Sequence, residues 1–177
     1  MWRSLFLEKK TKNVNVVAIN ELGSLESSHH LLNFDSVHGK LPFYVNKTKS
    51  GLKYDNKKIA FFSEKDPRKL PWKKLKIDVV LECSGVFTSK EKAMAHIKAG
   101  AKKVIISAPS DNPDITVVYG VNHKEINNNH KIISNASCTT NCLAPIANIL
   151  NDNIGIETGH MTTIHSYTGD QRIVDTF

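Results

Sequence analysis

The sequence has few of the residues that mark several common classes of protein. It contains only 3 cysteines, at positions 83, 138 and 142, an odd number too small for a disulfide framework. No apolar stretch approaches the roughly 20 residues needed to span a bilayer, and the opening at residues 1–7 is too short and wrongly flanked for a signal peptide. These absences argue against a disulfide-stapled secreted domain or a membrane-spanning protein, and they favour a cytosolic protein with reduced thiols.

Arginine is also scarce. The 24 basic residues outnumber the 17 acidic ones and give a net charge of +7, but only Arg3, Arg68 and Arg172 are arginines. Proteins that read nucleic acids usually rely on arginine and concentrate it on one face, whereas the lysines here are scattered along the chain. A solvated, lysine-rich surface is therefore favoured over a nucleic-acid site, and a basic binding module remains the alternative.

The overall composition is that of an ordinary globular protein. With 177 residues, of which 40% are hydrophobic and 23% charged, the chain is long enough for one domain, or for one domain and part of another. We find no internal repeat and no low-complexity tract. The clearest boundary is at 151–153, which predicts one domain over residues 1–150 and the start of a second over 151–177.

Short β-branched runs alternate with helical patterns, which favours βαβ units and a mainly parallel sheet with helices on both faces. The fold class predicted is therefore α/β, a Rossmann-type doubly wound sheet, with the first strand of a truncated α+β domain after it. Strands are expected at 14–19, 78–83, 103–107, 116–120, 131–134 and 160–165, and helices at 25–36, 88–100 and 137–150.

Some features are predicted in more detail. Residues 43–62 are predicted to form short strands of a small antiparallel sheet. The helix at 25–36 should turn Leu31, Leu32 and Phe34 inward, and residues 88–91 match a capping box for the next helix. Pro145 should bend the helix that begins at residue 137.

No G-x-G-x-x-G loop occurs in the sequence, although the rest of the pattern suits a dinucleotide site. In a Rossmann domain an acidic residue binds the adenine ribose about 20 residues after that loop, at the end of the second strand. Glu21 ends such a strand, and counting back 20 residues reaches Met1. Glu21 is therefore either a ribose ligand that favours NAD over NADP, with the loop just upstream, or a solvated turn residue.

Cys138 follows a predicted strand directly and opens a helix. Unpaired backbone N–H groups and the helix dipole at that place lower a thiol pKa. Neighbouring hydroxyls, among them Ser137 and Thr139, suit a polar substrate or a phosphate. Cys142, one turn later, is expected to be a small core residue; a C-x-x-x-C metal site is the weaker alternative, because no second pair has zinc-site spacing.

His165 ends the strand predicted at 160–165 and precedes a polar loop. A cysteine nucleophile and a histidine from a separate element form the general thiol–imidazole arrangement of nucleophilic catalysis. A single histidine on a strand is also a common structural residue, so chemistry alone leaves both roles open.

Taken together, these stretches resemble the glyceraldehyde-3-phosphate dehydrogenase family in its bacterial glycolytic form, over essentially the whole chain. The most specific is SNASCTTNC at 134–142, similar to the family's active-site signature. The supporting stretches are ECSGVFT at 82–88, GAKKVIISAP at 100–109, VYGVN at 118–122 and TIHSYT at 163–168.

The resemblance implies a role for individual residues. It makes Cys138 the nucleophile, His165 its base and NAD the cofactor, with glyceraldehyde 3-phosphate and inorganic phosphate as substrates. On the cysteine and histidine spacing above, no metal is expected. It implies substrate or phosphate contacts for Ser137, Thr139, Thr168 and Asp170. It implies cofactor contacts for Glu21, Lys65, Ser84, Gly85 and Ser107.

The resemblance also implies what this chain lacks: the first strand with its glycine loop, and most of the catalytic domain after Phe177. It implies a homotetramer for the complete enzyme and little activity for these 177 residues. Two rival readings stay open, an erythrose-4-phosphate dehydrogenase, which the sequence also resembles around residues 20–22, and a non-catalytic NAD-binding remnant.

Overall fold

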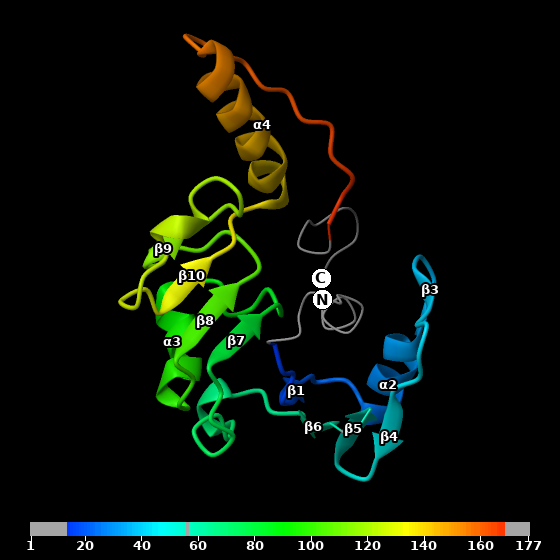
Figure 1. Cartoon of the computed structure of the whole chain (residues 1–177). Coiled ribbons are helices and arrows are strands. Elements are labelled where there is room, and N and C mark those ends of the chain that lie inside the picture. The colour runs from blue at the N-terminus through cyan, green and yellow to red at the C-terminus, as the bar shows by residue number, and fades with distance from the viewer. Residues whose placement is uncertain (1–13, 56, 169–177) are drawn as a thin grey trace, which may run out of the picture. The chain divides into compact units, whose positions relative to one another are not determined.

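The computed structural model describes residues 14–55 and 57–168, which form two compact units. The first unit comprises Met1–Ile77 with Lys98–Ala101, and the second comprises Asp78–Ile97 with Lys102–Phe177. Each unit has its own four-stranded sheet (Figure 1).

The first unit contains a mixed sheet in the order β1-β6-β5-β4. β1 runs parallel to β6, whereas β4, β5 and β6 form an antiparallel meander, as the sequence predicted. The elements are β1 (Ala18–Asn20), α2 (Leu25–Asn33), β2 (Phe34–Asp35), β3 (Gly39–Lys40), β4 (Asn46–Thr48), β5 (Gly51–Tyr54), β6 (Lys57–Phe62) and the 3-10 turn η1 (Pro67–Lys69).

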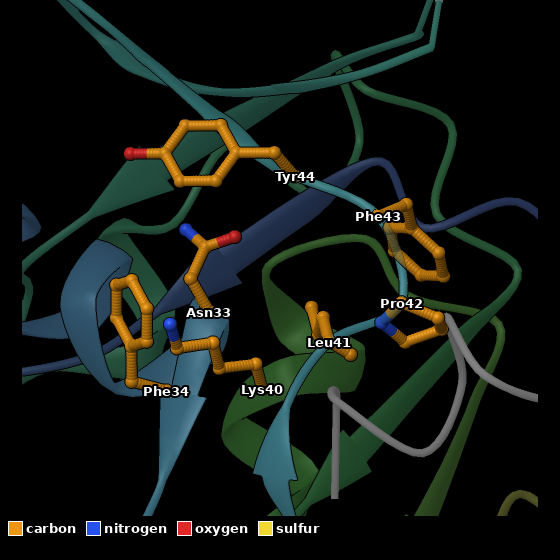
Figure 2. A pocket seen from close by; sticks show the side chains of 7 residues that line it. All are labelled: Asn33, Phe34, Lys40, Leu41, Pro42, Phe43 and Tyr44. Atoms are coloured by element: carbon orange, nitrogen blue, oxygen red, sulfur yellow. The ribbon is translucent and has the colours of Figure 1, made fainter.

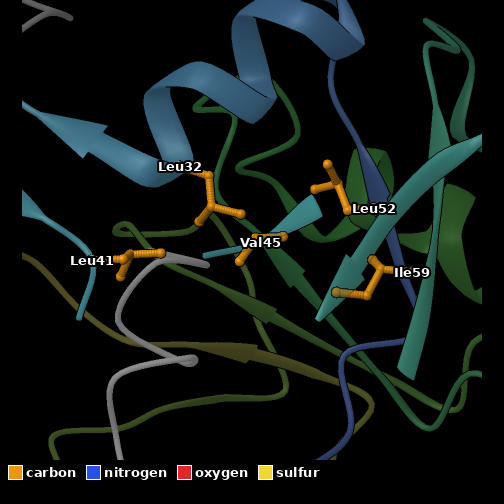
Figure 3. Close-up of a cluster of buried hydrophobic side chains, with 5 residues drawn as sticks. All are labelled: Leu32, Leu41, Val45, Leu52 and Ile59. Carbon is orange, nitrogen blue, oxygen red and sulfur yellow. The ribbon is translucent and has the colours of Figure 1, made fainter. Parts of the chain in front are cut away.

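A cluster of aliphatic side chains fills the space between α2 and this sheet (Figure 3). Its buried members are Leu32, Leu41, Val45, Leu52 and Ile59. Burying each of these side chains contributes about 1.5–3 kcal/mol relative to leaving it exposed. The cluster therefore fixes the register of the meander, because a shift by one residue would turn Leu52 and Ile59 to the opposite face.

The orientation predicted for α2 is only partly right. Leu32 is 1% exposed, as expected, but Leu31 is 65% exposed, so its inward placement was wrong. The helix ends at Asn33, and Phe34 is half-buried in β2. The Asn33 side chain explains the early end: it donates to the carbonyl oxygens of His29 and Val45 and accepts from the Val45 N–H, which turns the chain away from the helix.

The second unit contains an all-parallel sheet in the order β7-β8-β10-β9, which confirms the α/β class. Its elements are β7 (Val79–Glu82), α3 (Lys90–Lys98), β8 (Lys103–Ile106), β9 (Ile115–Thr116), the 3-10 turn η2 (His123–Glu125), β10 (Ile132–Ser134) and α4 (Cys138–Ile154). Ala93 of α3 packs with Val104, Ile106 and Ile132, so α3 covers one face of this sheet.

α3 begins one residue later than the capping box suggested. The Ser89 hydroxyl accepts from the Lys92 N–H at 3.3 Å, and the Ser89 carbonyl accepts from the Ala93 N–H, which makes Ser89 rather than Thr88 the N-cap. Asp114 then ties the start of α3 to β10. Its carboxylate lies 2.6 Å from the Lys90 ammonium and accepts from the Lys131 and Ile132 amides.

α4 contains Pro145 in its interior, as predicted, and none of its residues is buried. Residues 160–165 form no strand, so the strand predicted there was wrong; residues 155–168 are exposed and carry no regular secondary structure beyond a bend. The physical reason is that a lone extended segment has no neighbour to complete its hydrogen bonds. No helix in the described ranges is long and apolar enough to cross a membrane.

Candidate active site

A tight turn between β10 and α4 positions Cys138 as the first residue of the helix. Ala136 adopts a left-handed conformation with φ of 56°, which costs a residue with a Cβ about 1 kcal/mol or more. The Asn141 side chain holds the turn from inside, because its Nδ2 donates to the carbonyl oxygens of Asn135 (2.7 Å) and Ser137 (2.9 Å). The strained turn thus presents Cys138 at the carboxyl edge of the sheet.

His165 lies directly against this cysteine. The Cys138 Sγ and the His165 Nε2 are 3.1 Å apart, and both residues are exposed. The other ring nitrogen, Nδ1, is hydrogen-bonded to the Ser166 carbonyl oxygen. A carbonyl only accepts, so Nδ1 carries a proton and Nε2 is the nitrogen that receives or returns the thiol proton.

The contact shifts the titration of both partners. The hydrogen bond from His165 lowers the pKa of the Cys138 thiol, and the Thr139 amide and hydroxyl lower it further. The Ser166 carbonyl and the Cys138 sulfur raise the pKa of His165. Both shifts favour a thiolate–imidazolium pair, the form that acts as nucleophile and acid–base catalyst.

The hydroxyls expected around the cysteine have different surroundings. Ser137 caps α4, since its Oγ accepts from the Thr140 N–H at 3.0 Å and lies 2.7 Å from the Thr140 hydroxyl. Thr139 contacts the Cys138 sulfur. Thr168 is exposed near the end of the described chain, and Asp170 lies outside the described residues.

Three expected cofactor ligands meet at the carboxyl edge of the second unit's sheet. Ser84 and Gly85 follow β7, and Ser107 follows β8, whereas Cys138 follows the neighbouring β10. Ligands of open α/β sheets bind outside this edge. Gly85 has φ of 75°, and a Cβ added there would meet no atom within 4 Å, so the backbone faces open space.

The two remaining expected ligands lie together in the first unit. Glu21 follows β1 and Lys65 follows β6, two parallel neighbours. The Asn20 side chain joins the ends of the two strands, donating to the Glu64 carbonyl (3.0 Å) and accepting from the Glu64 N–H (2.9 Å). Both Glu21 and Lys65 are exposed, as ribose or adenine ligands require.

Sequence reasoning missed several residues that shape these edges. Asn141 was considered only as part of a motif, and Ser134 was not singled out, although its hydroxyl donates to the Ala108 carbonyl and accepts from the Ala136 amide. Glu82, buried at the end of β7, was also missed. The sequence did offer a signal for Glu82, because it is a charged residue at the end of an apolar run. A charged residue in such a place is buried only when it has a partner.

The core placement expected for Cys142 was wrong, because its side chain is exposed on α4. Among the described residues, no group of three or more His, Cys, Asp or Glu side chains is arranged to hold a metal ion.

A pocket of about 260 Å³ lies in the first unit, next to the end of α2 (Figure 2). Its lining consists of Asn33, Phe34, Lys40, Leu41, Pro42, Phe43 and Tyr44. None of the expected site residues is among them, so we assign this pocket no part in the chemistry of the Cys138–His165 pair.

Comparison with known proteins agrees with this geometry. Residues 1–90 match the family model described as the NAD binding domain of glyceraldehyde 3-phosphate dehydrogenase, and residues 137–177 match the model of its C-terminal domain. The chain belongs to the glyceraldehyde-3-phosphate dehydrogenase family. It therefore contains an NAD-binding Rossmann domain, as the sequence predicted.

Among its relatives are proteins named glyceraldehyde-3-phosphate dehydrogenase from three bacteria. The Xanthobacter flavus protein is 52% identical over 96% of this chain and 51% of its own length. The Pseudomonas aeruginosa protein is 50% identical over 99% of this chain and 52% of its own length. The Thermotoga maritima protein is 51% identical over 97% of this chain and 51% of its own length. The chain thus spans about half the length of these relatives.

Proposed function

We propose that a chain of full family length carrying these residues catalyses the NAD-dependent, phosphorylating oxidation of glyceraldehyde 3-phosphate to 1,3-bisphosphoglycerate, a step of glycolysis. The observation that carries the proposal is the 3.1 Å contact between the Cys138 thiol and the His165 imidazole at the start of α4. A thiolate at a helix N-terminus beside an imidazolium is suited to attack an aldehyde.

Residues 1–150 would form the NAD-binding domain and residues 151–177 the start of the catalytic domain. Glu21 and Lys65, which follow the neighbouring strands β1 and β6, would hold the adenosine end of NAD, and the Glu21 carboxylate would repel the 2′-phosphate of NADP. The open space beside Gly85, with Ser84 and Ser107, suits the nicotinamide end. When bound, NAD supplies the acceptor for the hydride.

In the first step Cys138 Sγ bonds to the aldehyde carbon. The carbonyl oxygen gains negative charge, which the Ser137 and Cys138 amides at the start of α4 would stabilise by a few kcal/mol. The oxygen takes up the proton from the Nε2 of the His165 imidazolium to give a hemithioacetal, which leaves Nε2 free to act as a base. His165 Nε2 then removes that hydroxyl proton as the carbon loses its hydride, which leaves a thioester on Cys138.

In the second step an oxygen of inorganic phosphate bonds to the thioester carbon. The carbon–sulfur bond breaks, the acyl phosphate leaves, and the Cys138 thiolate is restored. His165 in its protonated form stabilises the returning thiolate, because the same 3.1 Å contact pairs opposite charges. Ser137, Thr139, Thr168 and Asp170 would contact the substrate or the phosphate.

Steady-state rates of NADH formation test this proposal. We would embed these 177 residues in a chain of full family length and compare glyceraldehyde 3-phosphate with erythrose 4-phosphate, using Cys138→Ser as the inactive control. We expect the three-carbon aldehyde to give the higher kcat/KM. Preference for the four-carbon aldehyde, or unchanged activity of Cys138→Ser, would contradict it.

We expect the 177-residue chain alone to form little NADH, because its relatives are about twice as long. Robust NADH formation by the purified chain would contradict that expectation. A homotetramer for the complete enzyme and a cytoplasmic location belong to the same proposal, and sedimentation of the full-length protein tests the first of them.

A further inference from the structure

A second acid–base pair lies outside the Cys138–His165 site and is almost fully buried. Glu82 ends β7 and is 7% exposed, and His96 of α3 is 4% exposed. The His96 Nε2 lies 2.9 Å from the Glu82 Oε2. Such buried pairs add little net stability compared with apolar residues of the same size, so their presence needs another explanation.

The other carboxylate oxygen of Glu82 holds the loop that follows β7. Oε1 accepts from the Ser84 amide at 2.8 Å and from the Ser84 hydroxyl. The Ser84 Oγ in turn accepts from the Val86 amide at 3.1 Å. Burial would raise the pKa of Glu82, but the hydrogen bonds from His96 and Ser84 outweigh it and lower the pKa, so the carboxylate remains ionised and accepts all of these bonds.

The same pair also contacts the far end of the loop. The Phe87 ring packs edge-on against the His96 ring, with centroids 6.0 Å apart and an interplanar angle of 76°. Gly85 lies between these two contact points, Ser84 and Phe87, and its left-handed backbone faces open space at the carboxyl edge of the sheet. Glu82 and His96 therefore hold the loop at Ser84 and at Phe87, on either side of Gly85, and leave the space beside Gly85 open.

We propose that Glu82 and His96 are positioning residues that hold the Ser84–Gly85 loop in the shape that receives the nicotinamide end of NAD. This inference rests on the proposed function, since it takes NAD as the ligand of this edge. It gives the buried pair a geometric role: His96 orients the Glu82 carboxylate, the carboxylate orients Ser84, and neither residue touches the cofactor.

Amide hydrogen exchange, followed by NMR on the whole chain without cofactor, tests the positioning. Glu82→Leu removes the acceptor at similar volume, whereas Glu82→Gln keeps an oxygen for Ser84. We expect exchange at Ser84 and Val86 to accelerate by about tenfold or more in Glu82→Leu and to be largely restored in Glu82→Gln. The amides of Val104 and Ile132 report whether the sheet is still folded.

Two further variants keep the test decisive if Glu82→Leu unfolds the unit. Ser84→Ala removes only the hydroxyl of the loop, and exchange at Val86 should then accelerate. His38→Leu is the matched control, because His38 also contacts a carboxylate, that of Asp35 at 3.1 Å, but on the surface of the first unit. Unchanged exchange at Ser84 in Glu82→Leu and at Val86 in Ser84→Ala would overturn the positioning role.

A titration with NAD, read from the amide shifts of Gly85 and Ser107, tests the link to the cofactor. We expect Glu82→Leu to weaken NAD binding by about tenfold and His38→Leu to leave it unchanged. Faster loop exchange with unchanged NAD affinity would overturn the link. The titration uses the same chain of full family length as the rate measurements; if NAD shifts no amide at this edge there, the proposed cofactor role fails, whereas the exchange rates still decide whether Glu82 positions the loop.

Discussion

Individual side chains at the Cys138 site are tuned by contacts that the sequence alone does not reveal. The motif around Cys138 predicted a helix start and a low thiol pKa, and the family resemblance implied His165 as its base; in the structure the His165 contact is the largest cause of the lowered pKa. The partner could not be derived from spacing, because the two residues are 27 positions apart and meet only through the folded chain. Asn141 and Ala136 show the same limit, since their importance lies in the geometry of one turn.

The pH profile of alkylation is the first prediction at this scale. Cys138 has a lowered pKa and His165 a raised one, so both shifts favour the thiolate–imidazolium pair, and the thiolate is lost as pH falls through the pKa of Cys138. Iodoacetamide should therefore label Cys138 well below the usual thiol pKa of about 8.5. Cys83, whose pKa is raised by partial burial of its sulfur, should react only at higher pH.

His165→Asn is the matching variant, because it removes the imidazole and retains a polar side chain. We expect the alkylation profile of Cys138 to move to higher pH while that of Cys83 stays in place, as measured by mass spectrometry of the labelled peptides. Equal, slow labelling of all three cysteines in the unaltered chain would contradict the assembled site.

Asp114 carries the second residue-scale prediction. Burial opposes its ionisation, but the Lys90 ammonium and the Ile132 and Lys131 amides outweigh that effect and lower its pKa from 3.8 to about 2. Since the folded pKa is the lower one, its stabilisation is complete above about pH 4 and is lost as pH falls toward 2.

Asp114→Asn should lower the free energy of unfolding at neutral pH by about 1–3 kcal/mol and flatten its decline in acid. Urea unfolding at a series of pH values measures both effects. The neighbouring Asp111→Asn, at an exposed side chain, is the control and should change stability by less than about 0.5 kcal/mol. Equal effects of the two variants would contradict this account of Asp114.

The local sequence pattern predicted most of the helices and strands. The errors arose where contacts with other parts of the chain determine whether an element forms and where it ends. The β-branched runs became β7, β8 and β10, because continuous apolar runs suit a parallel sheet covered by helices. Residues 160–165 have a similar pattern but find no strand beside them. Leu31 was predicted to face inward but is exposed, and α2, which was expected to continue to residue 36, ends at Asn33, where that side chain turns the chain away.

The β5–β6 hairpin gives a prediction at this scale. A Cβ at Gly51 would overlap with the Ile59 carbonyl oxygen on the neighbouring strand, and backbone cannot move aside cheaply. Gly51→Ala should therefore lower the unfolding free energy by about 1–3 kcal/mol. Gly159→Ala, where a Cβ would meet no atom within 4 Å, is the control and should be nearly neutral in thermal unfolding; a similar loss in both would contradict the steric cause.

At the scale of the whole molecule, the positive net charge could be taken as a sign of nucleic-acid binding. The net charge is +7, yet several basic side chains already pair with acids of the same unit. These pairs are Lys47 with Glu26, Arg68 with Asp66, Lys90 with Asp114, and Lys102 with Asp78. Such pairing leaves a mixed surface, unlike the continuous arginine-rich face that binds nucleic acid.

We accordingly expect weak association with short duplex DNA at low salt and none detectable at about 150 mM salt, as measured by fluorescence anisotropy. The physical reason is that scattered, partly paired lysines neutralise few phosphates at a time. Tight binding that persists at that salt concentration would favour the basic-module reading instead.

The exposure of Cys138 and of the segment that carries His165 has a consequence for product yield. Under the proposed function, an acyl group held on this exposed sulfur would be open to bulk water as well as to dissolved phosphate, so free carboxylic acid would compete with acyl phosphate as the released product. Energy conserved in the thioester is kept only if water is excluded while phosphate is admitted. The ratio of acid to acyl phosphate is therefore a direct measure of how well any longer form of the chain encloses Cys138.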